Sequence, residues 1–357
     1  MFTRFIVLLG VAAVTHAASA APTFKASRVS VGGDGGHDYI TAEPGTGRVF
    51  LSRGTHVMVV DGATGKLLGD IPDTPRMHGI ALVKKYNHGF ITSAGDSTVE
   101  MFDLKTLAVL KRIPVPVGGL DGIMYDASSD RVVLTNHSKP GTATFINPRA
   151  GDVVASVELE DEAPEGAVSD GKGRVFVNNE RKNTLQTIDL KTMKTVASWP
   201  LAPCKGPTGI AYDPKTRRIF SGCSGTSVVV DADSGKVVAT IANGEGVDAM
   251  GWDPVEKLLY IPAGRSGNVT VVHQDSADQY TTLATVETMA GTKTIAVDPS
   301  AHKAYTLAVE YGPAPAAGAM AGGAPAGTPV GPAGGPGAGG PPARGPVTGA
   351  QLFTISH

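Results

Sequence analysis

Polar side chains recur at one position of a repeated sequence unit about every forty residues, and four of them are carboxylates. The seven are Asp38, His78, Asp121, Glu165, Thr208, Asp248 and Lys293, and His37 precedes the first. Carboxylate oxygens alone would suit calcium, whereas including His78 would suit a transition metal. Carboxylates held close together would also raise some of their pKa values and create a potential general base. The alternative is that these groups are ordinary solvated side chains.

A second set of polar residues follows another repeated segment of the chain. The set comprises Arg53, Asn136, His137, Asn179 and Glu180. Together with the first set, they make the second to fourth units the sector where ligand contact is expected. Within it, Asp121, Glu165 and His78 are the candidate metal ligands. Arg53 could hold a substrate carboxylate or phosphate, or simply neutralise nearby carboxylates.

The elements that position these residues are short strands with an aromatic or apolar anchor residue in each unit. The anchors are Phe50, Phe90, Val133, Phe176, Phe220, Tyr260 and Tyr305. A strand ending in an acidic turn precedes each anchor, as in GIAYDPKTR at 209–217, and two further strands follow, as in VVVDADSGK at 228–236 and KVVATI at 236–241. Asp and Pro at such positions are typical of tight turns. Each unit is therefore predicted to be a four-stranded antiparallel sheet.

Seven such sheets predict an all-β, seven-bladed β-propeller, because radial repetition covers faces that one sheet cannot bury alone. A linear solenoid usually has shorter repeats and capping units. The last unit supplies two strands at about 293–308 and a third, QLFTIS, at 351–356. We expect the segment 24–31 to add the missing strand and close the seventh blade. The Gly/Pro/Ala-rich segment at about 312–349 is expected to be a disordered loop inserted in that blade.

The beginning of the chain resembles a secretory signal, and the chain contains two cysteines. Arg4, the apolar run 5–14 and the small residues 18–20 predict a signal peptide at 1–20, followed by one propeller domain at 21–357. We therefore expect a periplasmic or secreted protein with no transmembrane segment. In such a compartment Cys204 and Cys223 can form a disulfide, and both are expected in loops on the same face of the fifth blade.

The repeated units resemble those of the YVTN-repeat, YncE-like periplasmic propellers. GIAYDP at 209–214, RVVLTN at 131–136 and VDPSAHKAY at 297–305 carry this resemblance, which covers the expected mature chain outside the Gly/Pro/Ala-rich loop. The resemblance implies a seven-bladed propeller, often without established catalysis. It is informative about fold rather than function, because the repeat residues are structural and propellers host many activities.

Two function hypotheses follow. The first is a monomeric cell-envelope binding or scaffold protein that holds a small polar ligand, a divalent cation or an envelope protein at its channel face. The second is a metal-assisted hydrolase of the lactonase type, using channel carboxylates around a divalent ion. The formal net charge of −2 and the lack of a basic stripe argue against nucleic acid as a partner.

Overall fold

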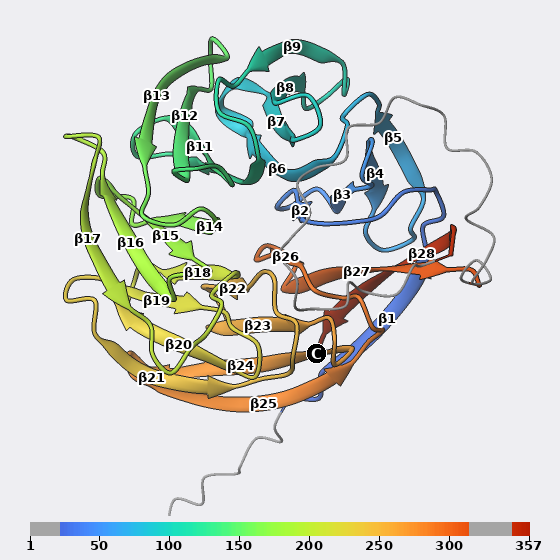
Figure 1. Ribbon diagram of the computed structural model, residues 1–357. Coiled ribbons are helices and arrows are strands. Elements are labelled where there is room, and N and C mark those ends of the chain that lie inside the picture. Colours follow the sequence, from blue (N-terminus) through green and yellow to red (C-terminus); the bar gives the residue numbers. More distant parts are fainter. Residues whose placement is uncertain (1–21, 314–344) are drawn as a thin grey trace, which may run out of the picture.

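The strands form seven four-stranded antiparallel sheets arranged as the blades of a ring (Figure 1). The computed structural model describes residues 22–313 and 345–357. Blades one to three consist of β2 (Ile40–Ala42), β3 (Arg48–Ser52), β4 (Val57–Asp61) and β5 (Leu67–Ile71); β6 (Met77–Val83), β7 (His88–Ser93), β8 (Thr98–Asp103) and β9 (Val109–Pro114); and β10 (Leu120–Asp126), β11 (Arg131–Asn136), β12 (Thr142–Asn147) and β13 (Asp152–Glu158). A 3-10 turn, η1 (Lys84–Tyr86), joins β6 to β7.

The other four blades complete the circle. They consist of β14 (Pro164–Ser169), β15 (Arg174–Asn179), β16 (Thr184–Asp189) and β17 (Lys194–Pro200); β18 (Ile210–Asp213), β19 (Arg218–Ser221), β20 (Thr226–Asp231) and β21 (Val237–Ala242); β22 (Gly251–Asp253), β23 (Leu258–Ala263), β24 (Asn268–Ser276) and β25 (Gln279–Glu287); and β26 (Ile295–Asp298), β27 (Lys303–Tyr311), β28 (Val347–Ser356) and β1 (Lys25–Ser30). The predicted seven-bladed propeller with four strands per blade is confirmed.

The seventh blade joins both ends of the described chain, as expected. Its strand order is β1-β28-β27-β26, and β1 pairs antiparallel with β28 from Lys25 opposite Ser356 to Ser30 opposite Gln351. The third strand begins earlier than the sequence indicated, at Val347 rather than 351, because β27 continues to Tyr311 and pairs with it. Strand β28 therefore occupies the C-terminal end of the segment 312–349 that was expected to be a loop, and β27 ends directly before this segment. Its middle, 314–344, and the predicted signal peptide lie outside the described residues.

Within residues 22–313 and 345–357, seven apolar clusters, each shared by two neighbouring blades, hold the ring together. The anchors Phe50, Phe90, Phe176 and Phe220 are all fully buried, and burying such a side chain contributes about 1.5–3 kcal/mol. One cluster contains residues of blades one and seven, so the circle closes with the same kind of core that joins the other blades. The middle strands are buried on both faces for this reason, whereas outer strands such as β17 alternate between exposed and half-buried residues. No helix in the described ranges is long and apolar enough to cross a membrane.

Candidate functional site

The seven recurring polar residues lie where the innermost strands begin, around one end of the central channel. In blades two to five the next residue along the chain is glycine, at positions 79, 122, 166 and 209. A Cβ at Gly79 would lie 2.8 Å from Ile123 Cγ2, and one at Gly209 would lie 2.5 Å from the carbonyl carbon of Ala249. These glycines therefore let neighbouring innermost strands approach closely, which brings the preceding polar side chains together.

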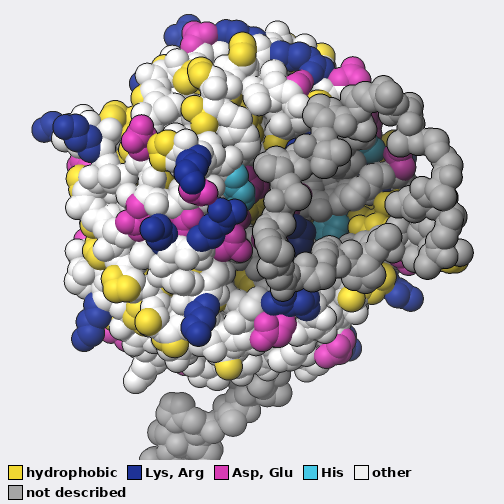
Figure 2. Space-filling model, in the orientation of Figure 1, with side chains coloured by type: hydrophobic (Ala, Val, Ile, Leu, Met, Phe, Trp, Pro, Cys, Tyr) yellow, Lys and Arg dark blue, Asp and Glu magenta, His cyan; other side chains and the backbone are white. Residues whose placement is uncertain are grey.

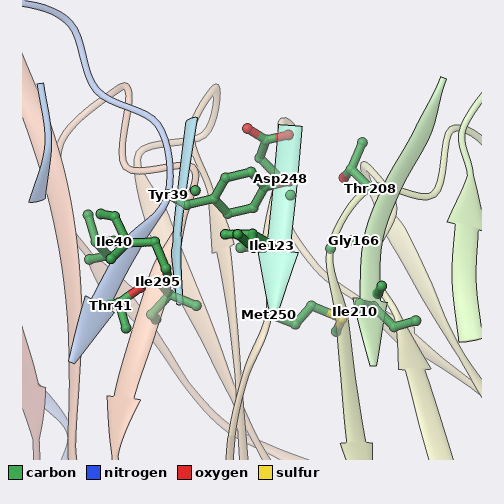
Figure 3. A pocket seen from close by; sticks show the side chains of 16 residues that line it. Tyr39, Ile40, Thr41, Ile123, Gly166, Thr208, Ile210, Asp248, Met250 and Ile295 are labelled. Atoms are coloured by element: carbon green, nitrogen blue, oxygen red, sulfur yellow. Dashed lines mark hydrogen bonds between the residues drawn. The ribbon is translucent and has the colours of Figure 1, made fainter. Parts of the chain in front are cut away.

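Blade one places a tyrosine at this glycine position. Tyr39 lines a cavity of about 160 Å³ in the channel together with Gly79, Gly122 and Gly166, and Figure 3 shows its ring reaching toward Asp248. A Cβ added to Gly122 would lie 3.8 Å from the Tyr39 hydroxyl oxygen. Sequence reasoning missed Tyr39. The detectable signal was one aromatic residue at a position where the other units carry Gly, Ala or Thr.

Seven charged side chains form a continuous series around the channel opening, which we call the channel arc. In order along the arc they are Asp248, Lys293, Asp38, His78, Asp121, His137 and Glu165. The Lys293 ammonium donates to Asp248 Oδ2 at 2.6 Å and to Asp38 Oδ1 at 3.0 Å. His78 Nδ1 lies 2.5 Å from Asp38 Oδ2 and 3.6 Å from Asp121 Oδ1. These contacts link residues of five blades, and Glu165 extends the arc to a sixth; acid and base alternate along it.

His137 completes the arc from a different strand end. It follows β11, and its Nε2 lies 2.9 Å from Asp121 Oδ2 and 3.2 Å from Glu165 Oε1. The carboxyl groups of Asp121 and Glu165 are largely buried, whereas the His137 side chain is 36% exposed. The carboxylates therefore line the channel wall and the imidazole closes over them from the solvent side.

Burial and mutual charge strongly perturb the pKa values along the arc. Burial opposes the charge on His137, but hydrogen bonds to Asp121 and Glu165 outweigh it and raise its pKa to about 10. Burial, with the charge of Asp121, raises the pKa of Glu165 to about 7. The pKa of His78 is also raised, because its carboxylate partners outweigh its burial. The carboxylates therefore favour the charged form of both imidazoles, and the pKa of Glu165 lies near neutral pH.

Tyr39 and Lys293 respond to the same carboxylates. Burial, followed by the charges of Asp121, Glu165, Asp248 and Asp38, raises the pKa of Tyr39 well above its usual value. Burial lowers and the carboxylates of Asp248 and Asp38 raise the pKa of Lys293, with a net increase. Tyr39 is therefore a neutral hydroxyl donor beside the carboxylates, and Lys293 is a fixed cation.

Four candidate residues have other surroundings. The fully buried Arg53 donates to the carbonyl oxygens of the linker before β2, including that of Gly32 at 2.7 Å. The Asn136 amide donates to the Val117 carbonyl, and Asn179 donates to Gln186 Oε1 and neighbouring oxygens. Thr208 donates to the Val247 carbonyl. Each of these side chains bonds to nearby chain segments, because a buried polar group at a strand end needs such partners.

Glu180 and His37 lie beside the arc without being part of it. Glu180 is half-buried and packs near Gly206. The Nε2 atom of His37 lies 2.9 Å from the Gly291 carbonyl, and burial, together with the charge of Lys293, lowers its pKa to about 4. His37 and Lys293 also line a larger cavity of about 450 Å³ between blades six and seven. A ligand at the arc would therefore have open space next to it.

The predicted disulfide is present on the same face, in blade five. Cys204 and Cys223 are bonded, their Cα atoms are 5.7 Å apart, and both are buried in the cluster between blades four and five. The position that corresponds to the arc residues is occupied here by Thr208. Blade five therefore contributes a disulfide to the channel face but no charged side chain to the arc.

A second group of acids and histidine lies at the other end of the innermost strands. Asp253, Glu256 and His302, which we call the turn cluster, come from turns of blades six and seven. The Nδ1 atom of His302 lies 2.9 Å from Asp253 Oδ2, and the hydrogen bond to Asp253 raises the pKa of His302. His357 Nε2 is 3.5 Å from Glu256 Oε1. The cluster therefore ties the chain end to two blades.

The channel arc contains two sets of three potential metal ligands. One is Asp38, His78 and Asp121, and the other is Asp121, His137 and Glu165. Imidazole nitrogen with carboxylate oxygen suits zinc, manganese or iron better than calcium, which prefers oxygen ligands alone. Figure 2 shows acidic, basic and His side chains close together near the middle of this face rather than one extended patch of a single charge.

No protein-family model and no curated protein sequence matches the chain. Solved structures do. A chain of Kuenenia stuttgartiensis hydrazine synthase is 17% identical with a TM-score of 0.67, and 83% of this chain and 96% of that chain are covered. The RRP9 WD40 repeats are 11% identical with a TM-score of 0.68, covering 78% and 89%. A chain of the mitotic checkpoint complex is 13% identical with a TM-score of 0.67, covering 85% and 95%. At this identity the similarity identifies the fold alone: the chain is a seven-bladed β-propeller.

Proposed function

We propose that this protein is an exported binding propeller of the cell envelope that holds a divalent transition-metal ion, together with a small polar ligand, at its channel face. The single observation that carries this proposal is the convergence of three carboxylates and two imidazoles around Asp121. These groups come from four different blades, and their side chains contact one another across the blades. Two histidines among the carboxylates favour a transition metal over calcium.

The proposed location follows from chemistry of the chain outside the arc. The Cys204–Cys223 disulfide is consistent with an oxidising compartment, and the predicted signal peptide would direct the chain there. We propose a periplasmic or secreted monomer of the YVTN-repeat, YncE-like type. An envelope protein could also dock on the face that surrounds the arc, whereas the balanced charge argues against nucleic acid.

Metal content and binding test the proposal. The purified full chain is stripped of metal, and Mn²⁺, Zn²⁺ and Ca²⁺ are titrated in separately by calorimetry, with bound metal counted by elemental analysis. We expect stoichiometric binding of Mn²⁺ or Zn²⁺ and weaker binding of Ca²⁺. Glu165→Gln should weaken binding of the transition metals, while Asp253→Asn, in the turn cluster, should leave it unchanged. Absence of stoichiometric binding by all three ions would overturn the proposal.

A metal-assisted hydrolase is the second candidate. The observation in its favour is the Tyr39 hydroxyl, which stays protonated among the carboxylates and could donate a hydrogen bond to a carbonyl oxygen or to the oxyanion that forms from it. A bound divalent ion would polarise the carbonyl and activate water. Turnover of a lactone panel by the metal-loaded protein, absent from the metal-free protein, would support this candidate. Metal binding without turnover would favour the binding function.

A further inference from the structure

Asp121 faces two histidines with two different oxygen atoms. Its Oδ1 is 3.6 Å from His78 Nδ1, and its Oδ2 is 2.9 Å from His137 Nε2. A carboxylate that directs one oxygen to each of two neighbouring sites has the arrangement of a bridge between two metal ions.

The same nitrogen of each histidine also faces a second carboxylate. Asp38 Oδ2 lies 2.5 Å from His78, and Glu165 Oε1 lies 3.2 Å from His137. The ligand atoms of each set lie within 4.8 Å of one another. Each set therefore offers one imidazole nitrogen and two carboxylate oxygens. Three protein ligands leave further coordination positions of a divalent ion for water or a ligand.

We propose that the channel face holds two divalent transition-metal ions bridged by Asp121, one with Asp38 and His78 and the other with His137 and Glu165. The inference rests on the proposed metal-binding function and adds its stoichiometry and its ligand class. Two ions sharing a carboxylate lie roughly 3.5–4 Å apart in proteins.

The balance of charge indicates which ligand the pair would take. Two divalent ions bring four positive charges against three carboxylates, Asp38, Asp121 and Glu165. Lys293 and Asp248 form an ion pair beside them and add no net charge. The remaining single positive charge and the open coordination positions favour a small oxyanion. The Tyr39 side chain lines the channel cavity nearby and offers a hydroxyl group as a hydrogen-bond donor to it.

Stoichiometry and magnetic coupling test the pair. Metal-free full-length protein is titrated with Mn²⁺ alone, free and bound Mn²⁺ are counted, and the electron paramagnetic resonance spectrum is recorded. We expect two ions per chain and the signal of a spin-coupled pair. Asp121→Asn should abolish the coupled signal and weaken both sites. Glu165→Gln and Asp38→Asn should each leave one ion with an uncoupled signal, and Asp253→Asn should keep both ions.

The outcomes separate this inference from the proposed function. One bound ion per wild-type chain, without coupling, would overturn the pair and leave the metal-binding function standing. No bound ion would overturn both. Near-ultraviolet circular dichroism and the thermal midpoint establish that each variant is folded. Because the two outer variants remove ligands on opposite sides of Asp121, a folded Glu165→Gln or Asp38→Asn protein tests the pair even if Asp121→Asn is unstable.

The ligand class has its own measurement. Inorganic phosphate, titrated into the protein loaded with Mn²⁺, should bind and change the coupled spectrum, and it should not bind to the metal-free protein. Equal phosphate binding in the presence and absence of Mn²⁺ would overturn the assignment of the oxyanion to the metal pair.

Discussion

The channel arc and the turn cluster both combine Asp, Glu and His side chains, yet they have different roles in the repeat. Asp253 of the turn cluster ends an innermost strand, and its Oδ1 accepts the backbone N–H of Val255 at 2.8 Å. Asp126, Asp213 and Asp298 occupy the same place in three other blades and accept the N–H two residues later, at 2.9–3.1 Å. These acids build the turn that follows each strand.

At the arc position, by contrast, the residue type differs from blade to blade. From blade to blade it is Asp, His, Asp, Glu, Thr, Asp and Lys, and its charged members bond to side chains of other blades rather than to a local turn. An acid that occurs at the same place in many blades and makes the same turn contact has a structural role. A position whose residue type differs between blades but stays polar is not needed for the turn and can bind a ligand. The seven blades therefore provide an internal comparison that separates structural acids from candidate functional acids.

The largest expected effect is on metal affinity, in Asp121→Asn. Loss of the shared charged carboxylate should weaken Mn²⁺ binding by at least about a hundredfold, because even outer-sphere changes cost roughly 10–100-fold. Calorimetry on the folded variant measures this. If Asp253→Asn weakened binding as much as Asp121→Asn, the distinction between the two clusters would be wrong.

The disulfide gives the second largest effect, on stability alone. Replacing Cys204 and Cys223 together by Ser should lower the free energy of unfolding by about 3 kcal/mol in the chain-entropy model, because the bond closes a loop of 19 residues. Denaturant unfolding measures the change. The number of bound Mn²⁺ ions should stay the same, since blade five contributes no charge to the arc. Loss of bound metal would show that the disulfide shapes the metal site.

The third largest effect is expected on the free energy of unfolding, in the turn-cluster variant Asp253→Asn. The side chain is fully buried, and weakening the bonds that its carboxylate accepts from the turn N–H groups of Val255 and Glu256 should cost about 2 kcal/mol of stability, within the range for hydrogen bonds to charged groups. Chemical denaturation compares the variant with Asp121→Asn. A larger loss of stability in Asp121→Asn would mean that the arc, too, is mainly structural.

The same variant has a pH signature at His302. Asp253 raises the pKa of His302 above its ordinary value of 6.5. A raised folded-state pKa means that the contribution of the charged His302 to stability is full below pH 6.5 and is lost as the pH rises through the raised pKa. Asp253→Asn should return the pKa toward 6.5 in an NMR titration of the imidazole, and an unchanged value would contradict the assigned ion pair.

The smallest effect is expected for Tyr39→Phe. The variant keeps the ring that fills the channel and removes the hydroxyl, so phosphate binding to the Mn²⁺-loaded protein should weaken by about fivefold, the equivalent of one hydrogen bond of about 1 kcal/mol. Metal stoichiometry and the thermal midpoint should not change. Unaltered phosphate affinity would remove Tyr39 from the ligand site.

Much of the channel site was visible in the repeat. Aligning the units by their anchors placed Asp38, His78, Asp121, Glu165, Asp248 and Lys293 at one strand end, and the structure brings these six together, with His137, in one arc. The same reasoning did not separate them from Arg53, Asn136 and Asn179, which bond to neighbouring chain segments. Strand-end position is a property of the repeat, whereas the direction of a side chain depends on which neighbouring blade offers it a partner.

By itself the sequence determined the number of blades, the strands in each, the closure through β1 and the cysteine pair, because each follows from periodic patterns or a simple count. Only the tertiary structure decided that His137 is shared by Asp121 and Glu165, that Asp121 directs its two oxygens to two histidines, and that Tyr39 occupies the channel. These are relations between residues on different strands and, in most cases, on different blades. Their distances depend on blade packing and on the glycines that let innermost strands approach, which no local pattern encodes.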